Sequence, residues 1–198
     1  MINIEHKRQV NDGINWKCGA VCLEMIYDYF QVPYDNEEIW NNIKAQRYEN
    51  SVQMYSRTYK LAQDAISRGL PATIYRGRDA HILEDIDMLR TPAILSIQQV
   101  KSRESHFVVF QGIKNQNYCF CDPDTDKKTT NMKFIDVRDV WSPHREIGVT
   151  GYIFVIFNKM VDKAYKCKYC GQEVPLVHSE LLEKVEGFVC PHCDRLND

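Results

Sequence analysis

Cys18, His106 and Asp122 have the side-chain types from which an activated thiol nucleophile is built. From Cys18 onward the apolar residues recur at positions 18, 21, 22, 25, 26 and 29. This spacing predicts an α-helix that is buried along one stripe and begins at Cys18. Unpaired N–H groups and the helix dipole favour an anion at a helix start and lower the pKa of a thiol there.

Two interpretations of Cys18 stay open on this evidence. Lys17 adds a positive charge beside the thiol and Gly19 keeps side-chain bulk away from the sulfur, which suits a nucleophile. Free cysteine is also among the most buried residue types, so Cys18 could be a small core residue. Cys22, one helical turn further on, is expected to belong to the core.

His106 and Asp122 are informative as a pair, because the expected fold places them close together. Alone, a histidine at a strand start and an aspartate before a proline have ordinary structural explanations. Residues 106–113 and 118–122 are expected to form a hairpin about 114–117, which places their far ends side by side. A carboxylate next to an imidazole fixes its tautomer and stabilises its protonated form.

The elements that must position these residues follow from the apolar pattern. Helices are expected first and β-strands afterwards, which indicates an α+β fold with a mostly antiparallel sheet. A loop is expected over 127–132. The expected helices are 18–30, 35–44, 48–68, 79–89 and 134–141, and the expected strands are 71–75, 93–97, 106–113, 118–121 and 151–157.

Four further cysteines form two C-x-x-C pairs, Cys167/Cys170 and Cys190/Cys193, with residues 171–189 between them. Two such pairs at this spacing are typical of four thiolates on one tetrahedral Zn²⁺, whereas a redox dithiol would explain only one pair. His178 and His192 are the alternative ligands. Because so short a unit needs its metal to fold, we expect a structural zinc ribbon over 161–198, after a main domain over 1–160.

Composition narrows the class of protein. The 198 residues are 44% apolar and 26% charged, with a formal charge of −2, which argues against nucleic-acid and membrane partners. The sequence has no apolar run long enough to span a membrane and no cleaved signal. A cytoplasmic location is therefore expected, with export that needs no cleaved signal left open.

Over about residues 6–157 the sequence resembles the bacterial bacteriocin-processing, double-glycine leader peptidases of the papain-like cysteine peptidase superfamily. The resemblance is carried by Cys18-Gly-Ala-Val-Cys-Leu-Glu-Met-Ile26, by His106-Phe-Val-Val109 and by Cys121-Asp-Pro-Asp124. It implies a papain-like fold, with N-terminal helices packed on the sheet. It also implies that Cys18 is the nucleophile, His106 the general base and acid, and Asp122 the residue that orients the imidazole.

Members of that family carry a glutamine about six residues before the cysteine, where its amide helps to form the oxyanion hole. Position 12 of this sequence is an aspartate. The resemblance therefore points to Gln9 as the side-chain donor, with Asn15 as the second candidate. The backbone N–H of Cys18 would supply another hydrogen bond.

These observations predict a thiol hydrolase that acts on a peptide or protein substrate through a thioester, with peptide-bond cleavage as the first expectation. A glutamine deamidase or an acyl transferase on the same triad is the alternative, because the triad does not choose the acceptor. A third hypothesis is an inert adaptor. In each case the zinc ribbon is expected to offer a surface for a protein partner.

Overall fold

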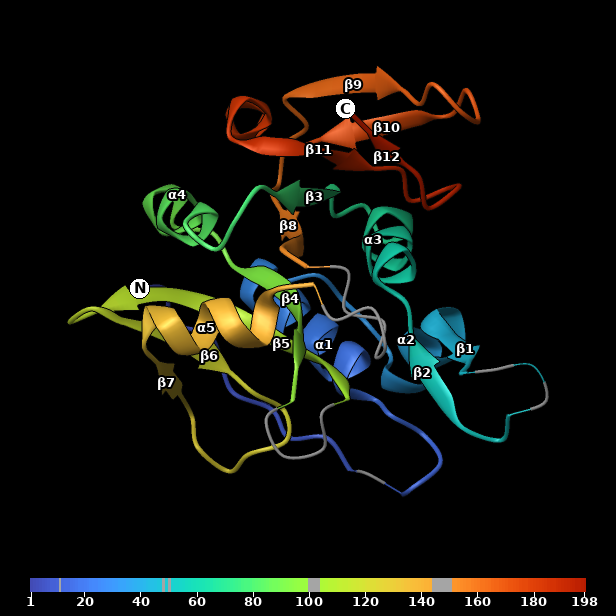
Figure 1. Ribbon diagram of the computed structural model, residues 1–198. Helices are drawn as coiled ribbons and strands as arrows, with labels where there is room; N and C mark the ends of the chain where they lie inside the picture. The colour runs from blue at the N-terminus through green and yellow to red at the C-terminus, as the bar shows by residue number, and fades with distance from the viewer. Residues whose placement is uncertain (11, 48, 50, 100–103, 144–150) are drawn as a thin grey trace.

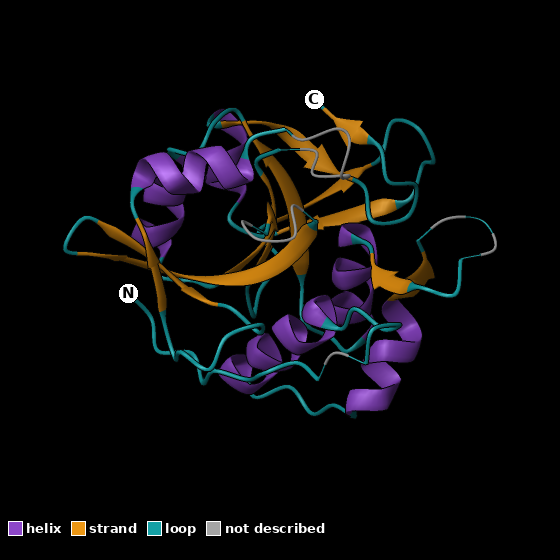
Figure 2. Ribbon diagram, turned by 60° about the horizontal axis from the view of Figure 1, so that its bottom comes forward, coloured by secondary structure: helices purple, strands orange, loops and turns teal. Residues whose placement is uncertain are grey.

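The computed structural model describes the whole chain except residues 11, 48, 50, 100–103 and 144–150. Its helices lie in two groups on opposite sides of a large antiparallel sheet (Figures 1 and 2). The α+β class predicted from the sequence is therefore confirmed. The helices are α1 (Cys18–Phe30), α2 (Asn36–Ile43), α3 (Thr58–Ser67), α4 (Ile82–Leu89) and α5 (Phe134–Trp141), with a 3-10 helix η2 (Ser179–Glu183).

Eight strands form the main sheet in the order β12-β11-β3-β8-β4-β5-β6-β7, and all neighbours in it are antiparallel. Two pairs of strands, β1 with β2 and β9 with β10, form separate small sheets. The strands are β1 (Lys44–Gln46), β2 (Met54–Ser56), β3 (Ala72–Gly77), β4 (Ala93–Gln98), β5 (Ser105–Lys114), β6 (Asn117–Cys121), β7 (Thr130–Met132), β8 (Ile153–Phe157), β9 (Lys163–Lys166), β10 (Glu173–Leu176), β11 (Val185–Val189) and β12 (Leu196–Asn197).

Both faces of the central strands are buried, because successive side chains of a strand point to opposite faces. Ile94 of β4 and Val109 of β5 belong to the core shared with α1, α2 and α3. Their neighbours Leu95 and Phe110 belong to the core shared with α4 and α5. Near-continuous apolar runs such as those of β4 and β5 are what a doubly covered sheet requires.

Helix α1 is more deeply buried than its sequence predicts. One apolar stripe was expected, but all residues from Cys18 to Tyr27 are buried. The helix lies against β5, α2, α3 and β2, so little of its surface faces water. It ends at Phe30, and the next residue, Gln31, has a left-handed backbone (φ 60°), while the N–H of Val32 donates to the carbonyl of Tyr27 at 2.9 Å.

Two elements differ from expectation. The helix expected over 48–68 begins only at Thr58, because Met54–Ser56 is strand β2; positions 48 and 50 lie outside the described residues. Met54 exchanges backbone hydrogen bonds with the segment before α1, which a helical pattern could not reveal: its N–H donates to Ile14 O and its carbonyl accepts from Trp16 N. The loop expected over 127–132 contains the edge strand β7, paired with β6.

The C-terminal segment adds to the main sheet. Strand β11 pairs with β3, and β12 pairs with β11, so residues 185–197 lengthen the sheet of the preceding domain. Strands β9 and β10 lie outside it as a separate pair. The division into 1–160 and 161–198 stays a prediction. Within the described part of the chain, no helix combines the length and the apolar character that crossing a membrane requires.

Gly112 is needed where β5 has an irregular register opposite β6. Its φ is +127°, and a Cβ there would overlap the Asp87 carboxylate and lie 2.8 Å from Met1 Cα. We therefore predict that Gly112→Ala lowers the free energy of unfolding by about 3 kcal/mol, from backbone strain and overlap together. Urea denaturation followed by far-UV circular dichroism measures this change.

Gly69→Ala is the matched control, because Gly69 also has a positive φ (+79°) but no atom within 4 Å of the added Cβ. It should cost about 1 kcal/mol from the backbone alone. Equal losses for the two variants would contradict the argument that the close contacts of Gly112 matter.

Candidate active site and metal centre

Cys18 is the first residue of α1 and is 4% exposed. Strand β2 holds the start of this helix from two directions. Its backbone pairs with the segment that leads into the helix, and Ser56 packs on Gly19 so closely that a Cβ on Gly19 would lie 2.8 Å from the Ser56 Cβ. The glycine after the cysteine is therefore required by packing against β2.

The structure brings His106 and Asp122 together. His106 is the second residue of β5 and Asp122 directly follows β6, the partner strand. His106 Nε2 lies 2.7 Å from Asp122 Oδ1, and the His106 side chain is 4% exposed. The hairpin turns at Asn115 and Gln116, both with positive φ, which places the two ends side by side.

The pKa values of this pair indicate that it is charged. Burial by itself lowers the pKa of His106, but hydrogen bonds to Asp122 and to Cys18, and the charges of both, outweigh it and raise this pKa to about 10. Burial likewise raises the pKa of Asp122, and the hydrogen bond to His106 and its charge bring the net value below the usual one. Cys18, His106 and Asp122 thus form one connected group of side chains.

The segment 122–124 also holds the N-terminal part of the chain. The carbonyl of Asp122 lies 3.0 Å from His6 Nε2, and the carbonyl of Pro123 accepts from the N–H of Gln9 at 2.9 Å. The N–H of Asp124 donates to Asp122 Oδ1 at 2.9 Å, which orients the carboxylate bound to the imidazole.

Asp124 is a residue of the site that sequence reasoning did not assign. Its Oδ2 lies 3.9 Å from His106 Nδ1, on the other side of the ring from Asp122. Its carboxylate also accepts hydrogen bonds from the amides of Gln9 and Gln99. The available signal was the second aspartate of Asp122-Pro-Asp124, and its importance depends on contacts across three segments.

The two candidate oxyanion donors have different surroundings. Gln9 is 6% exposed and donates from Nε2 to Asp124, so it belongs to the group around His106, and its Oε1 is buried without a partner in the described structure. Asn15 donates instead to Asp12 Oδ2 at 2.7 Å. Hydrogen bonds from Asn15 and Ile14 favour the charged form of the Asp12 carboxyl and lower its pKa to about 2.

A cavity of about 410 Å³ adjoins this group, lined by Arg8, Gln9, Val10 and Asp124. Two of the lining residues, Gln9 and Asp124, belong to the group around His106. Two other buried thiols are disfavoured as anions, because burial raises the pKa of Cys22 well above its usual value and that of Cys121 to about 12.

The second cluster consists of the four C-terminal cysteines, whose Sγ atoms all lie within 4.8 Å of one another. Cys167 and Cys193 are 3.7 Å apart at sulfur, and so are Cys170 and Cys190. Four thiolates about 2.3 Å from a tetrahedral metal would be about 3.8 Å apart, whereas a disulfide needs about 2.05 Å. The four residues therefore fit a metal. Neither His178 nor His192 belongs to the cluster.

The two C-x-x-C pairs have the same local structure. In each turn the N–H four residues after the first cysteine donates back to that cysteine's carbonyl at 2.9 Å, from Gly171 to Cys167 and from Asp194 to Cys190. Both donor residues have a left-handed backbone, at φ 73° and 56°. Because both turns present their sulfurs to one point, the chain itself arranges the tetrahedral donor set.

The model of the peptidase C39 family matches residues 6–144 of the chain. No curated protein shows a significant match.

Several solved structures share the fold. A double-glycine-motif protease from an AMS/PCAT transporter, in complex with the leader peptide, is 19% identical with a TM-score of 0.56, covering 78% of this chain and 91% of its own. The peptidase domain of Streptococcus ComA, a bi-functional ABC transporter of a quorum-sensing pathway, is 16% identical with a TM-score of 0.61, covering 80% and 100%. The peptidase domain of Streptococcus mutans ComA is 16% identical with a TM-score of 0.51, covering 78% and 98%.

The raised pKa of His106 gives a test of the charged pair. We predict that Asp122→Asn lowers this pKa well below about 10, because the variant loses the anion that holds the proton. NMR titration of the imidazole signals measures the change. Asp126→Asn is the control, since Asp126 pairs with Arg8 at the surface, and it should leave the titration of His106 unchanged.

The same pair links stability to pH. A raised pKa means that the stabilisation is complete below pH 6.5 and is lost as the pH rises to about 10. Asp122→Asn should flatten this part of the curve of unfolding free energy against pH. A variant curve as steep as that of the parent protein would refute the assignment.

Proposed function

Because the chain belongs to the peptidase C39 family, and is therefore a cysteine peptidase-like hydrolase, we propose that it cleaves a peptide bond in a peptide or protein substrate. The observation that carries the proposal is the buried His106, hydrogen-bonded to Asp122 and to the thiol at the start of α1. We assign Cys18 as nucleophile, His106 as general base and acid, and Asp122 as the residue that orients the ring.

The reaction proceeds in two stages. With the proton that Cys18 and His106 share already on the His106 imidazole, the Cys18 thiolate attacks the substrate carbonyl carbon. The resulting tetrahedral adduct collapses to a thioester as His106 gives that proton to the leaving amine. In the second stage the now neutral His106 takes a proton from water and the hydroxide attacks the thioester. The carboxyl product then leaves, and the Cys18 thiolate and the protonated His106 beside it are restored.

Negative charge develops on the substrate oxygen in both stages, and we propose two donors for it. The backbone N–H of Cys18 is one, because the first N–H groups of a helix have no partner within it. The amide of Gln9 is the other. An amide nitrogen carries two hydrogens, so Gln9 can donate one to Asp124 and keep the second for the oxyanion. Asn15 is held by Asp12 and is the weaker candidate.

Asp124 acts in this proposal as a positioning residue. Its carboxylate accepts a hydrogen bond from the Gln9 amide, and its Oδ2 lies 3.9 Å from His106 Nδ1. It therefore keeps the Gln9 amide on the same side of the site as Nδ1 of the imidazole. The cavity beside Gln9 and Asp124 offers room for an extended stretch of substrate. A structural neighbour of this chain binds a leader peptide, and we propose that this chain likewise accepts an extended peptide.

We further propose that the four-cysteine cluster holds one structural Zn²⁺ and that 161–198 is a zinc ribbon. Thiolate sulfurs are the ligands that Zn²⁺ prefers in closed structural sites. Such an ion would join the turn after β9 to the turn after β11, and so tie the outer pair of strands to the main sheet. The ribbon would offer a surface to a protein partner. A cytoplasmic location stays a prediction of the sequence.

The nucleophile is tested with Cys18→Ala. The parent enzyme should react with iodoacetamide at Cys18 faster than a free thiol at neutral pH, and it should cut an extended peptide library as read by mass spectrometry. Cys18→Ala should lower cleavage by at least about 10³-fold, and Gln9→Ala by about 10²-fold, the usual cost of one oxyanion donor. Cys119 is a buried thiol outside the site, so Cys119→Ala should leave the iodoacetamide reaction and the cleavage rate unchanged.

Mass spectrometry also separates the alternatives. A one-dalton-scale shift would identify a glutamine deamidase, and an adduct would identify an acyl transferase. Ordinary thiol reactivity at Cys18 together with an unchanged library would identify an inert adaptor. Each of these outcomes would replace peptide cleavage as the function.

The metal is tested by elemental analysis. We predict about one zinc per chain, falling to near zero in Cys170→Ser after dialysis against a chelator, because three thiolates hold the ion more weakly than four. Cys119→Ser should keep its zinc. Loss of metal should speed hydrogen exchange in β9 and β11 while α1 stays protected, and a parent protein without zinc would refute the assignment.

A further inference from the structure

Strand β9 (Lys163–Lys166) has an open edge. Among the residues that the structure describes, it pairs with β10 alone, in a two-stranded sheet. Figure 1 places it at the outer limit of the molecule, beyond β10 and β11. All four of its residues are exposed. An edge of this kind presents unpaired backbone groups on which another strand can form.

The register shows which backbone groups face outward. The N–H of Cys167 donates to Gln172 O at 2.8 Å, and hydrogen-bonded positions alternate along an antiparallel pair. Tyr165 therefore turns its N–H and carbonyl toward β10, and Ala164 and Lys166 turn theirs to the open side. Pro175, opposite Ala164, agrees with this, because it has no N–H to donate.

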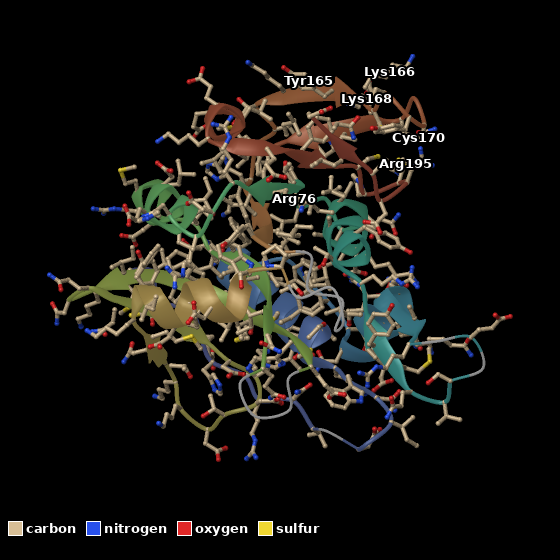
Figure 3. All side chains as sticks on the ribbon, viewed as in Figure 1. Arg76, Tyr165, Lys166, Lys168, Cys170 and Arg195 are labelled. Atoms are coloured by element: carbon tan, nitrogen blue, oxygen red, sulfur yellow. The ribbon has the colours of Figure 1, made fainter. Side chains whose placement is uncertain are left out.

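Side chains along this edge would recognise a particular kind of strand. Residues 163–169 contain three lysines and no acidic residue. The Arg195 guanidinium adds a fourth cation, 5.1 Å from the Tyr169 ring, while Lys168 is paired with Asp198. Figure 3 shows Tyr165, Lys166, Lys168 and Arg195 near one another, on the outer C-terminal strands and the loops next to them.

Apolar side chains are exposed beside these cations. Val161 is 45% exposed, Tyr165 42% and Tyr169 50%, within nine residues of chain. Alternation places Lys163 and Tyr165 on one face of β9 and Ala164 and Lys166 on the other. A strand laid along this edge would therefore meet a lysine on either face and an aromatic ring on one.

We propose that the open edge of β9 binds an extended segment of a partner protein, rich in acidic residues, by adding it as a strand. Backbone hydrogen bonds to Ala164 and Lys166 would give affinity, and the lysines would select acidic side chains at alternate positions. This inference rests on the proposed role of the ribbon as a docking surface, and it names the mode of binding and the chemistry of the partner.

A metal ion bound by the cysteine cluster would make this edge rigid. Cys167 directly follows β9, and its sulfur lies 3.7 Å from that of Cys193, in the turn after β11. On the other side, the carbonyl of Pro175 in β10 accepts from Thr73 Oγ1 of β3 at 2.9 Å. A strand held at both its end and its back loses little freedom when a peptide binds, so binding costs less entropy.

The test uses the full chain loaded with zinc and the labelled peptide Glu-Val-Glu-Val-Glu-Val-Glu. Peptide titration should shift the amide NMR signals of Ala164 and Lys166 more than those of β4, and fluorescence anisotropy should show binding. Ala164→Pro should weaken binding at least tenfold, because it removes an outward N–H at a position where β10 needs none. Ala164→Val keeps the N–H and should bind like the parent.

Two further measurements keep the outcome clear. Zinc content and the rate at which iodoacetamide modifies Cys18 should be unchanged in Ala164→Pro. A loss of peptide binding without a change in either would then be due to the edge of β9 itself. If Ala164→Pro loses zinc, the double variant Lys163→Glu, Lys166→Glu tests the proposal in its place. This variant should bind Lys-Val-Lys-Val-Lys-Val-Lys more tightly than the acidic peptide. Equal binding of acidic and basic peptides, or binding of an oligothymidylate instead, would overturn the proposal while leaving the peptidase proposal intact.

Discussion

The hydrogen bond between His106 and Asp122 is the interaction on which the rest of the site depends. The imidazole is 4% exposed, and a charge in so little contact with water is stable only beside its partner. Three elements must therefore meet within hydrogen-bond distance: the start of β5, the residue after β6 and the start of α1. The bond makes a histidine that burial alone would neutralise into one that keeps its proton and holds a thiol nearby.

Short segments, rather than long helices or strands, hold the residues around this hydrogen bond in place. Residues 122–124 bind the imidazole with one aspartate and the amide of Gln9 with the next, and their carbonyls hold the N-terminal segment. Strand β2 does the same for the start of α1 through Met54 and Ser56. The hydrogen bonds of these segments pair backbone and side-chain groups in a buried region, where leaving such groups unpaired is costly.

The small C-terminal segment contacts the rest of the protein in two different ways. Strands β11 and β12 join the large sheet, whereas β9 and β10 lie outside it, next to the cysteine cluster and in contact with β3. The Sγ separations of 3.7 Å suit a tetrahedral metal. Strand β9, at the outer limit of this segment, presents an open edge.

The sequence by itself determined the α+β class, the helix that begins at Cys18, the hairpin that joins His106 to Asp122 and the four-cysteine cluster, because each is set by local periodicity, by turn residues or by ligand spacing. Only the tertiary structure decided the surroundings of Gln9 and Asn15, the place of Asp124 beside His106, strand β2 where a helix was expected, and the pairing of β11 with β3. Those features arise from hydrogen bonds between residues far apart in the chain, and a single sequence carries no local pattern for such contacts.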